Sequence, residues 1–126
     1  MITGIHHVSM RCRGEAEYRR VLGFYTDLLG LKPARQWDGA VMVDTGGGYI
    51  EIFRDRGDAP VKGVVNHFAL ACTDTAATAE KLKTAGYEVF MGPAEVTLPC
   101  DPPLPACIAF VRGPRGEEIE LFQERG

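Results

Sequence analysis

The sequence predicts an α+β fold of two tandem β-α-β-β-β modules, and three observations lead to this prediction. The segment His7–Cys12 is echoed by His67–Cys72. The segment Tyr49–Phe53 is echoed by Glu118–Phe122. Helix signals follow the earlier segment of each half. Because an internal repeat sets the architecture of a chain, we expect each half to contribute one copy of the same module.

Length and composition predict a single globular domain. The 126 residues are 45% hydrophobic and 25% charged, which is close to globular averages. A chain of this size forms one core. We therefore expect one domain over residues 1–126, with module one at about 3–55 and module two at about 64–124.

Charge and hydropathy patterning exclude several classes of partner. The net charge is −3 and no basic run occurs, which argues against a nucleic-acid surface. No apolar stretch approaches the ~20 residues of a membrane span. Residues Met1–Gly4 lack signal-peptide character. We expect a cytoplasmic protein.

The first module begins with a strand at Ile5–Cys12, which alternates apolar and polar residues. A helix is predicted over Glu15–Leu29, with Gly30 at its end. Its apolar stripe consists of Tyr18, Val21, Leu22, Tyr25, Leu28 and Leu29. Three strands follow, separated by glycine-containing turns, at Lys32–Trp37, Ala40–Thr45 and Tyr49–Arg54.

The second module repeats this order after a polar connector at Asp55–Gly63. A strand at Asn66–Thr73 precedes a helix that Asp74 or Thr75 caps and that runs to about Ala85, with Gly86 as its C-cap. Strands are predicted at Tyr87–Met91, Ala106–Val111 and Glu117–Gln123, and a turn at Gly113–Gly116 joins the last two.

An insertion distinguishes the second module from the first. The separation between equivalent positions grows from 44 residues (7 to 51) to 53 (67 to 120), and the excess falls where prolines cluster, at Pro99–Pro105. Long loops near a site often act as lids or specificity elements. A tolerated surface insertion explains the segment equally well.

The repeat places two histidines and two glutamates on one face of the predicted strands. Alternation puts His7, Glu51, His67 and Glu120 opposite bulky apolar residues, which face the helices. Taken singly, each is more typical of a structural or solvated residue. Four such residues at corresponding positions favour a shared site, because nitrogen and oxygen donors of this kind bind one divalent metal ion.

Neighbouring residues receive a structural interpretation. Alternation predicts that His6 points to the helix side of the sheet, where its echo is Asn66. Cys12 and Cys72 are interpreted as small buried residues. Cys100 lies in the proline-rich segment, where exposure is expected.

Two further segments carry a resemblance to a known family. The helix end Phe24–Leu31 resembles the "FY…LG" segment of the vicinal oxygen chelate superfamily, and Val111–Leu121 resembles its terminal hairpin. The superfamily includes glyoxalase I, methylmalonyl-CoA epimerase, fosfomycin-resistance thiol transferases, extradiol dioxygenases and bleomycin-binding proteins. The resemblance implies a curved mixed sheet around a metal cleft.

Within this superfamily the chain most resembles glyoxalase I, whose His-Glu-His-Glu ligand pattern is matched by His7, Glu51, His67 and Glu120. The resemblance implies one divalent ion (Ni²⁺, Zn²⁺, Co²⁺ or Mn²⁺) and a lyase or isomerase activity, like that of lactoylglutathione lyase. The substrate would be a small α-hydroxy or α-keto carbonyl compound or a thiohemiacetal, which reacts through an enediolate.

The same resemblance assigns roles to individual residues. Glu120 and Glu51 would be catalytic, with Glu120 favoured as the base. Arg11 would anchor a carboxylate of a thiol conjugate, and Asp55 argues against glutathione because it adds a negative charge. The pocket wall would consist of Tyr49, Phe53, Phe122 and Ala69.

The sequence is compatible with two other functions, and it predicts one assembly state. One alternative is another metalloenzyme of the superfamily, an epimerase or a thiol transferase, although Glu51 argues against a transferase. The other is a non-catalytic small-molecule-binding protein, which would need no metal. A homodimer is expected because open sheets leave edges that pairing would cover. The ligands of one site then come from one chain or from two.

Overall fold

The computed structural model describes residues 1–28, 30–54, 63–113 and 118–126. In chain order, the elements are β1 (Ile2–Cys12), α1 (Gly14–Gly23), a π-helical turn η1 (Phe24–Leu28), β2 (Lys32–Trp37), β3 (Ala40–Asp44), β4 (Tyr49–Arg54), β5 (Val65–Cys72), α2 (Thr75–Thr84), β6 (Val89–Leu98), β7 (Leu104–Arg112) and β8 (Glu118–Glu124).

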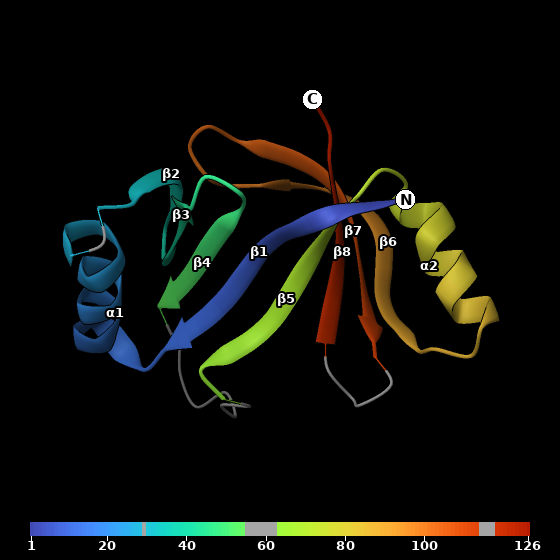
Figure 1. Ribbon diagram of the computed structural model, residues 1–126, viewed down its shortest axis with the longest axis horizontal. Helices are drawn as coiled ribbons and strands as arrows, with labels where there is room; N and C mark the ends of the chain where they lie inside the picture. The colour runs from blue at the N-terminus through green and yellow to red at the C-terminus, as the bar shows by residue number, and fades with distance from the viewer. Residues whose placement is uncertain (29, 55–62, 114–117) are drawn as a thin grey trace.

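The strands form one curved sheet in which the two modules meet at the centre (Figure 1). The strand order is β2-β3-β4-β1-β5-β8-β7-β6. β1 pairs in parallel with β4, and β5 pairs in parallel with β8, whereas β1 and β5 run antiparallel and join the modules. The predicted α+β fold of two β-α-β-β-β modules is confirmed, and its sheet is mixed.

Each helix covers the apolar face of its own module. α1 packs on β1 and β4, in a cluster that contains Tyr18, Ile50 and Ile52. α2 packs on β6, β7 and β8, in a cluster that contains Ala79 and Leu121. Because alternate strand residues face opposite sides, residues between these apolar positions face away from the helices. This is the arrangement that the alternation predicts.

The first helix ends earlier than its periodicity predicts. α1 stops at Gly23 and the chain continues as a π-helical turn, rather than as an α-helix to Leu29. Glycine weakens a helix interior. In the following turn the Thr26 hydroxyl donates to the Leu22 carbonyl oxygen over 2.9 Å, a side-chain bond that competes with the helical ladder. Leu29 lies outside the described residues.

The inserted segment of module two extends a hairpin instead of forming a long loop. β6 runs to Leu98 and β7 begins at Leu104, so most of the extra residues are in paired strands. The tip reaches module one, where the Asp101 amide donates to the Gln36 carbonyl oxygen over 2.8 Å. Cys100 is 4% exposed and packs with Leu104, so the expected exposure of its thiol is wrong.

Two predicted segments lie wholly or largely outside the described residues. The connector Asp55–Gly63 is described only at its last residue, and the turn Gly113–Gly116 only at its first. In the described part of the chain, no helix has the length and apolar character needed to cross a bilayer.

Candidate metal centre

The register between β1 and β5 places the repeated residues around a local two-fold axis. Val8 pairs with Phe68 at its centre, His7 pairs with Ala69, and Ser9 pairs with His67. On the outer sides, Glu51 of β4 pairs with Ser9, and Glu120 of β8 pairs with Ala69. His7, Ala69 and Glu120 therefore lie in one row across three strands, and His67, Ser9 and Glu51 lie in the corresponding row of the other half.

The small residues at the centre make room for the larger ones. Ser9 and Ala69 are both 0% exposed, so the surrounding side chains cover them completely. A side chain longer than a methyl or hydroxymethyl group at either position would project into the space where the imidazoles and carboxylates meet. The site thus depends on two side chains that carry no metal-binding group of their own.

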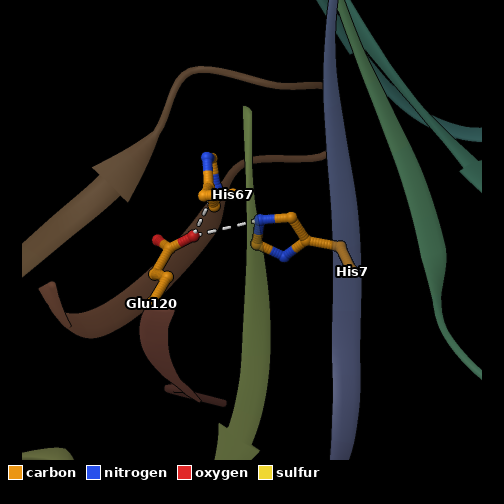
Figure 2. Close-up of side chains that lie close together, drawn as sticks. All are labelled: His7, His67 and Glu120. Atoms are coloured by element: carbon orange, nitrogen blue, oxygen red, sulfur yellow. Dashed lines mark hydrogen bonds and ion pairs between the residues drawn. The ribbon is translucent and has the colours of Figure 1, made fainter. Parts of the chain in front are cut away.

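Three of the four repeated residues converge on one point (Figure 2). The Oε2 atom of Glu120 lies 3.0 Å from the Nε2 atom of His7 and 3.0 Å from the Nε2 atom of His67. One ligand atom from each residue lies within 4.8 Å of the other two. All three come from a single chain, so this group needs no second subunit.

The donor set and its spacing fit a divalent cation. The Nε2 atom of His7 is buried and has no hydrogen-bond partner with acceptable geometry among the described residues. Such an orphaned nitrogen is costly unless a ligand satisfies it. Two ligand atoms about 2.1 Å from one ion and at right angles to each other are about 3 Å apart, which matches the separations around Glu120. Residues His7, His67 and Glu120 are therefore a possible metal-binding site.

Glu51 lies beside this group without joining it. Its Oε1 atom is 3.5 Å from His7 Nε2, and its side chain is almost fully buried. Glu51 approaches one imidazole, whereas Glu120 lies between both. The structure thus gathers three of the four predicted ligands and places the fourth in their immediate neighbourhood.

The electrostatics of the two glutamates differ although the repeat makes them equivalent. Burial raises the pKa of Glu51, and the adjacent His7 only partly offsets that effect. Burial also acts to raise the pKa of Glu120, but the imidazoles of His67 and His7 outweigh it, so the pKa of Glu120 is lowered. Burial acts to lower the pKa of His7, but the carboxylates of Glu120 and Glu51 outweigh it and raise the pKa.

His6 lies next to the site, and its predicted position on the helix side is wrong. Its ring stacks on Phe122 with centroids 4.1 Å apart, and its Nδ1 atom is 2.9 Å from Nδ1 of His7. The pairing of β1 with β5 shifts register between Ile5 and His7, which breaks the alternation on which the prediction rested. The only signal in the sequence is the His6-His7 doublet itself.

A cavity of about 540 Å³ lies at the C-terminal ends of β1 and β4, and His7, Glu51, His67 and Glu120 are not among the described residues that line it. Arg11 pairs with Phe53 two residues beyond the Ser9–Glu51 pair on each strand, so this pair lies on the same face as Glu51. The cavity is lined by Arg11, Trp37, Asp38, Gly39, Phe53, Arg54 and Pro99. Pro99 belongs to the inserted hairpin, which therefore contributes to the cavity wall.

The four residues predicted to bind substrate fall into two groups. Arg11 and Phe53 line the cavity. Tyr49 and Phe122 instead surround His6, with ring centroids 5.3 and 4.1 Å from its imidazole. The sequence did not place Trp37 at this site, and it left open whether Pro99–Pro105 lies near the site or is a surface insertion, because both depend on how the hairpin of module two docks on module one.

Comparisons with known proteins agree with this fold. A family model for the glyoxalase/bleomycin resistance protein/dioxygenase superfamily matches residues 4–121. No curated protein matches the sequence. A methylmalonyl-CoA epimerase from Mycobacterium tuberculosis has a similar structure, with 17% identity, a TM-score of 0.75 and coverage of 99% of this chain and 90% of that one.

Two further solved structures are similar over nearly the whole chain. A variant of the Streptomyces coelicolor methylmalonyl-CoA epimerase, in complex with 2-nitronate-propionyl-CoA, has 20% identity, a TM-score of 0.73 and 100% coverage of both chains. The Mn(II)-bound glyoxalase from Novosphingobium aromaticivorans has 18% identity and a TM-score of 0.74, and the match covers 97% of this chain and 39% of that one. At these identities the likeness is one of fold.

Proposed function

Because the chain belongs to the glyoxalase/bleomycin resistance protein/dioxygenase superfamily, we propose that it is a metal-dependent lyase or isomerase of the glyoxalase I type. It moves a proton between adjacent carbons of a small α-hydroxy or α-keto carbonyl compound, or of a thiohemiacetal. The observation that carries this proposal is the buried convergence of His7, His67 and Glu120, with Glu51 beside them.

In this proposal His7, His67 and Glu120 hold the ion through Nε2, Nε2 and a carboxylate oxygen, and Glu51 completes the set. Mixed nitrogen and oxygen donors suit Ni²⁺, Zn²⁺, Co²⁺ or Mn²⁺. When bound, such an ion stabilises the negative charge that develops on the substrate oxygens as a carbon gives up its proton. The structural likeness to an Mn(II)-bound glyoxalase is compatible with this assignment.

Glu51 is the better candidate for the proton carrier, in contrast to the preference for Glu120 at the level of sequence. The Oε2 atom of Glu120 lies 3.0 Å from both imidazoles, so movement of this carboxylate would break up the group. Glu51 contacts one imidazole at 3.5 Å and is less constrained. Its carboxylate takes a proton from one carbon and returns it to the neighbouring carbon.

The proposed reaction is an isomerisation and needs no external oxidant or reductant. In a thiohemiacetal of methylglyoxal, the C–H bond at the sulfur-bearing carbon breaks and a new C–H bond forms at the adjacent carbon. The hydroxyl proton passes from the first oxygen to the second. The product is an α-hydroxy thioester with the same atoms, and burial of Glu51 limits proton exchange with water.

In this proposal the cavity that begins two residues beyond Glu51 on β4 supplies substrate recognition. Arg11 makes no ion pair within the part of the chain that the structure describes, whereas Arg54 contacts Glu15. Arg11 is therefore suited to bind an anionic group, such as the carboxylate of a thiol conjugate. Trp37 and Phe53, whose rings are 6.0 Å apart, provide an apolar wall for the remainder of the substrate.

The test is a metal-dependent isomerase assay. Protein stripped with a chelator is reloaded with each of the four ions, and thioester formation is followed with methylglyoxal plus glutathione or plus mercaptoethanol. Activity that appears with metal and disappears in Glu51→Gln supports the proposal. Full metal occupancy with no activity on either adduct overturns it, and turnover of methylmalonyl-CoA would replace it with the epimerase alternative.

A further inference from the structure

The residue immediately before each candidate histidine ligand contacts the Nδ1 atom of that histidine. In module two, Asn66 Oδ1 lies 2.8 Å from His67 Nδ1. In module one, His6 Nδ1 lies 2.9 Å from His7 Nδ1. Positions 6 and 66 are echoes of each other in the repeat, so the same support is built twice with different side chains.

On the module-two side, the direction of the hydrogen bond follows from chemistry. An amide oxygen only accepts, so His67 Nδ1–H donates a hydrogen bond to Asn66 Oδ1. A neutral imidazole that carries its proton on Nδ1 has a free lone pair on Nε2. Asn66 therefore selects the form of His67 whose Nε2 can bind a cation.

On the module-one side, two imidazole nitrogens face each other and either could donate. A third residue resolves this ambiguity, because His6 Nε2 lies 2.6 Å from Glu124 Oε1. An ionised carboxylate only accepts, so His6 carries its proton on Nε2 and its Nδ1 accepts from His7. His7 therefore donates to His6 and His6 donates to Glu124, which leaves the lone pair of His7 Nε2 facing Glu120 and His67.

Packing holds this chain of hydrogen bonds in place. His6 is 7% exposed and His7 is 1% exposed, so water has little access to the contact between their rings. The ring of His6 stacks on Phe122 and lies edge-on to the ring of His7, with an interplanar angle of 85°. Glu124 is close to the C-terminus of β8, the same strand that carries Glu120.

We propose that His6 and Glu124 are positioning residues that fix the proton of His7 on Nδ1, and that Asn66 does the same for His67. This inference rests on the proposed function only in that both histidines bind the ion. Loss of the outer hydrogen-bond partner of a ligating histidine typically lowers metal affinity about 10–100-fold. Loss of the acceptor at position 6 or 66 should therefore weaken Mn²⁺ binding by that factor.

Two substitutions at position 6 separate the hydrogen bond from packing. His6→Phe keeps a ring that stacks on Phe122 but cannot accept a hydrogen bond from His7, so Mn²⁺ affinity should fall about 10–100-fold. His6→Asn loses the ring but copies the acceptor of module two, so affinity should stay within about threefold of the starting protein. A purely structural role for His6 predicts the opposite order. The matched pair at position 66 is Asn66→Leu against Asn66→Asp.

The experiment is an Mn²⁺ titration followed by electron paramagnetic resonance, together with thermal unfolding of each variant to show that it is folded. Nitrogen-15 NMR of the metal-free protein at about pH 8 reports the histidine tautomers independently of metal and activity. Protonated Nδ1 in both His7 and His67, together with the stated order of affinities, supports the proposal. A neutral His7 or His67 ring that carries its proton on Nε2, or equal affinities for His6→Phe and His6→Asn, overturns it.

The two proposals fail in distinguishable ways. If the unmodified protein binds Mn²⁺ but shows no isomerase activity, the proposed function fails and the affinity order at position 6 still tests the role of His6. If the unmodified protein binds none of the four ions, the metal site fails, and the NMR tautomers alone decide whether Glu124 orients His6 and His7.

Discussion

His67 Nε2 and Glu120 Oε2 lie 3.0 Å apart, although 53 residues separate them in the chain. They are not direct cross-strand neighbours, because Glu120 pairs with Ala69 and the two side chains meet diagonally. The same carboxylate oxygen also reaches His7 of the other module at 3.0 Å. This oxygen atom of Glu120 therefore contacts one histidine from each half of the repeat. Such an arrangement is expected if both histidines bind the same cation.

The two glutamates should respond differently to neutralisation. Glu120→Gln removes the charge between both imidazoles, so Mn²⁺ affinity should fall by more than the roughly 10–100-fold that loss of an outer partner costs. Glu51→Gln keeps an oxygen donor but cannot carry a proton, so turnover should fall about 10²–10⁴-fold while metal content persists. Metal analysis and steady-state kinetics on both variants check this. Normal turnover by metal-loaded Glu51→Gln would assign the proton transfer to another group.

Ala69 should tolerate only a small replacement. Ala69→Leu inserts three carbon atoms between His7 and Glu120, and overpacking of this kind costs about 1–3 kcal/mol of unfolding free energy. It should also abolish Mn²⁺ binding, because the new side chain separates the ligands.

The repeat supplies the control for this substitution. Ala69→Ser copies the residue at the equivalent position, Ser9, and should retain metal binding. Denaturant unfolding with and without Mn²⁺ measures both effects. If Ala69→Leu bound Mn²⁺ as tightly as Ala69→Ser does, the site would not depend on the space above this residue.

Arg11 should matter for anionic substrates only. Arg11→Ala removes the cavity cation that has no ion pair within the described residues, so KM for the adduct of a carboxylate-bearing thiol should rise about tenfold. KM for the mercaptoethanol adduct, which has no carboxylate, should change little, and this comparison serves as the internal control. An equal loss with both adducts would indicate a structural role for Arg11.

Metal affinity should depend on pH through His7. The carboxylates beside this residue raise its pKa above the ordinary value of 6.5 in the metal-free protein. A protonated imidazole cannot bind a cation, so the Mn²⁺ association constant should increase with pH until this raised pKa is passed, by up to about tenfold per unit. Titrations at constant ionic strength between about pH 6 and pH 8 measure this. Affinity that is constant across that range would show that no histidine proton is displaced.

Much of the fold was predictable because the repeat appears twice and each copy supports the other. Both strand–helix units were found, and the spans Lys32–Trp37 and Tyr49–Arg54 match the structure residue for residue. The α-helix limit at Gly23 was not predicted, because the apolar period continues through the π-helical turn. The length of β6 was also missed, because its second half is strand only by pairing with β7.

The sequence predicted the residue types of the candidate site, but it did not predict the different positions of Glu51 and Glu120. Equivalent positions in the repeat implied equal roles for Glu51 and Glu120, whereas in the folded sheet Glu120 contacts both histidines and Glu51 contacts one. His6 was misplaced because a register shift is a property of the pairing between β1 and β5. Local alternation in the sequence contains no information about that shift.

The most direct test of this account is an anomalous-scattering map from crystals of the protein grown with Mn²⁺. One strong peak should lie within about 2.5 Å of His7 Nε2, His67 Nε2 and a carboxylate oxygen of Glu120. A map with no peak among these three atoms, or with the ion bound elsewhere on the chain, would contradict the account.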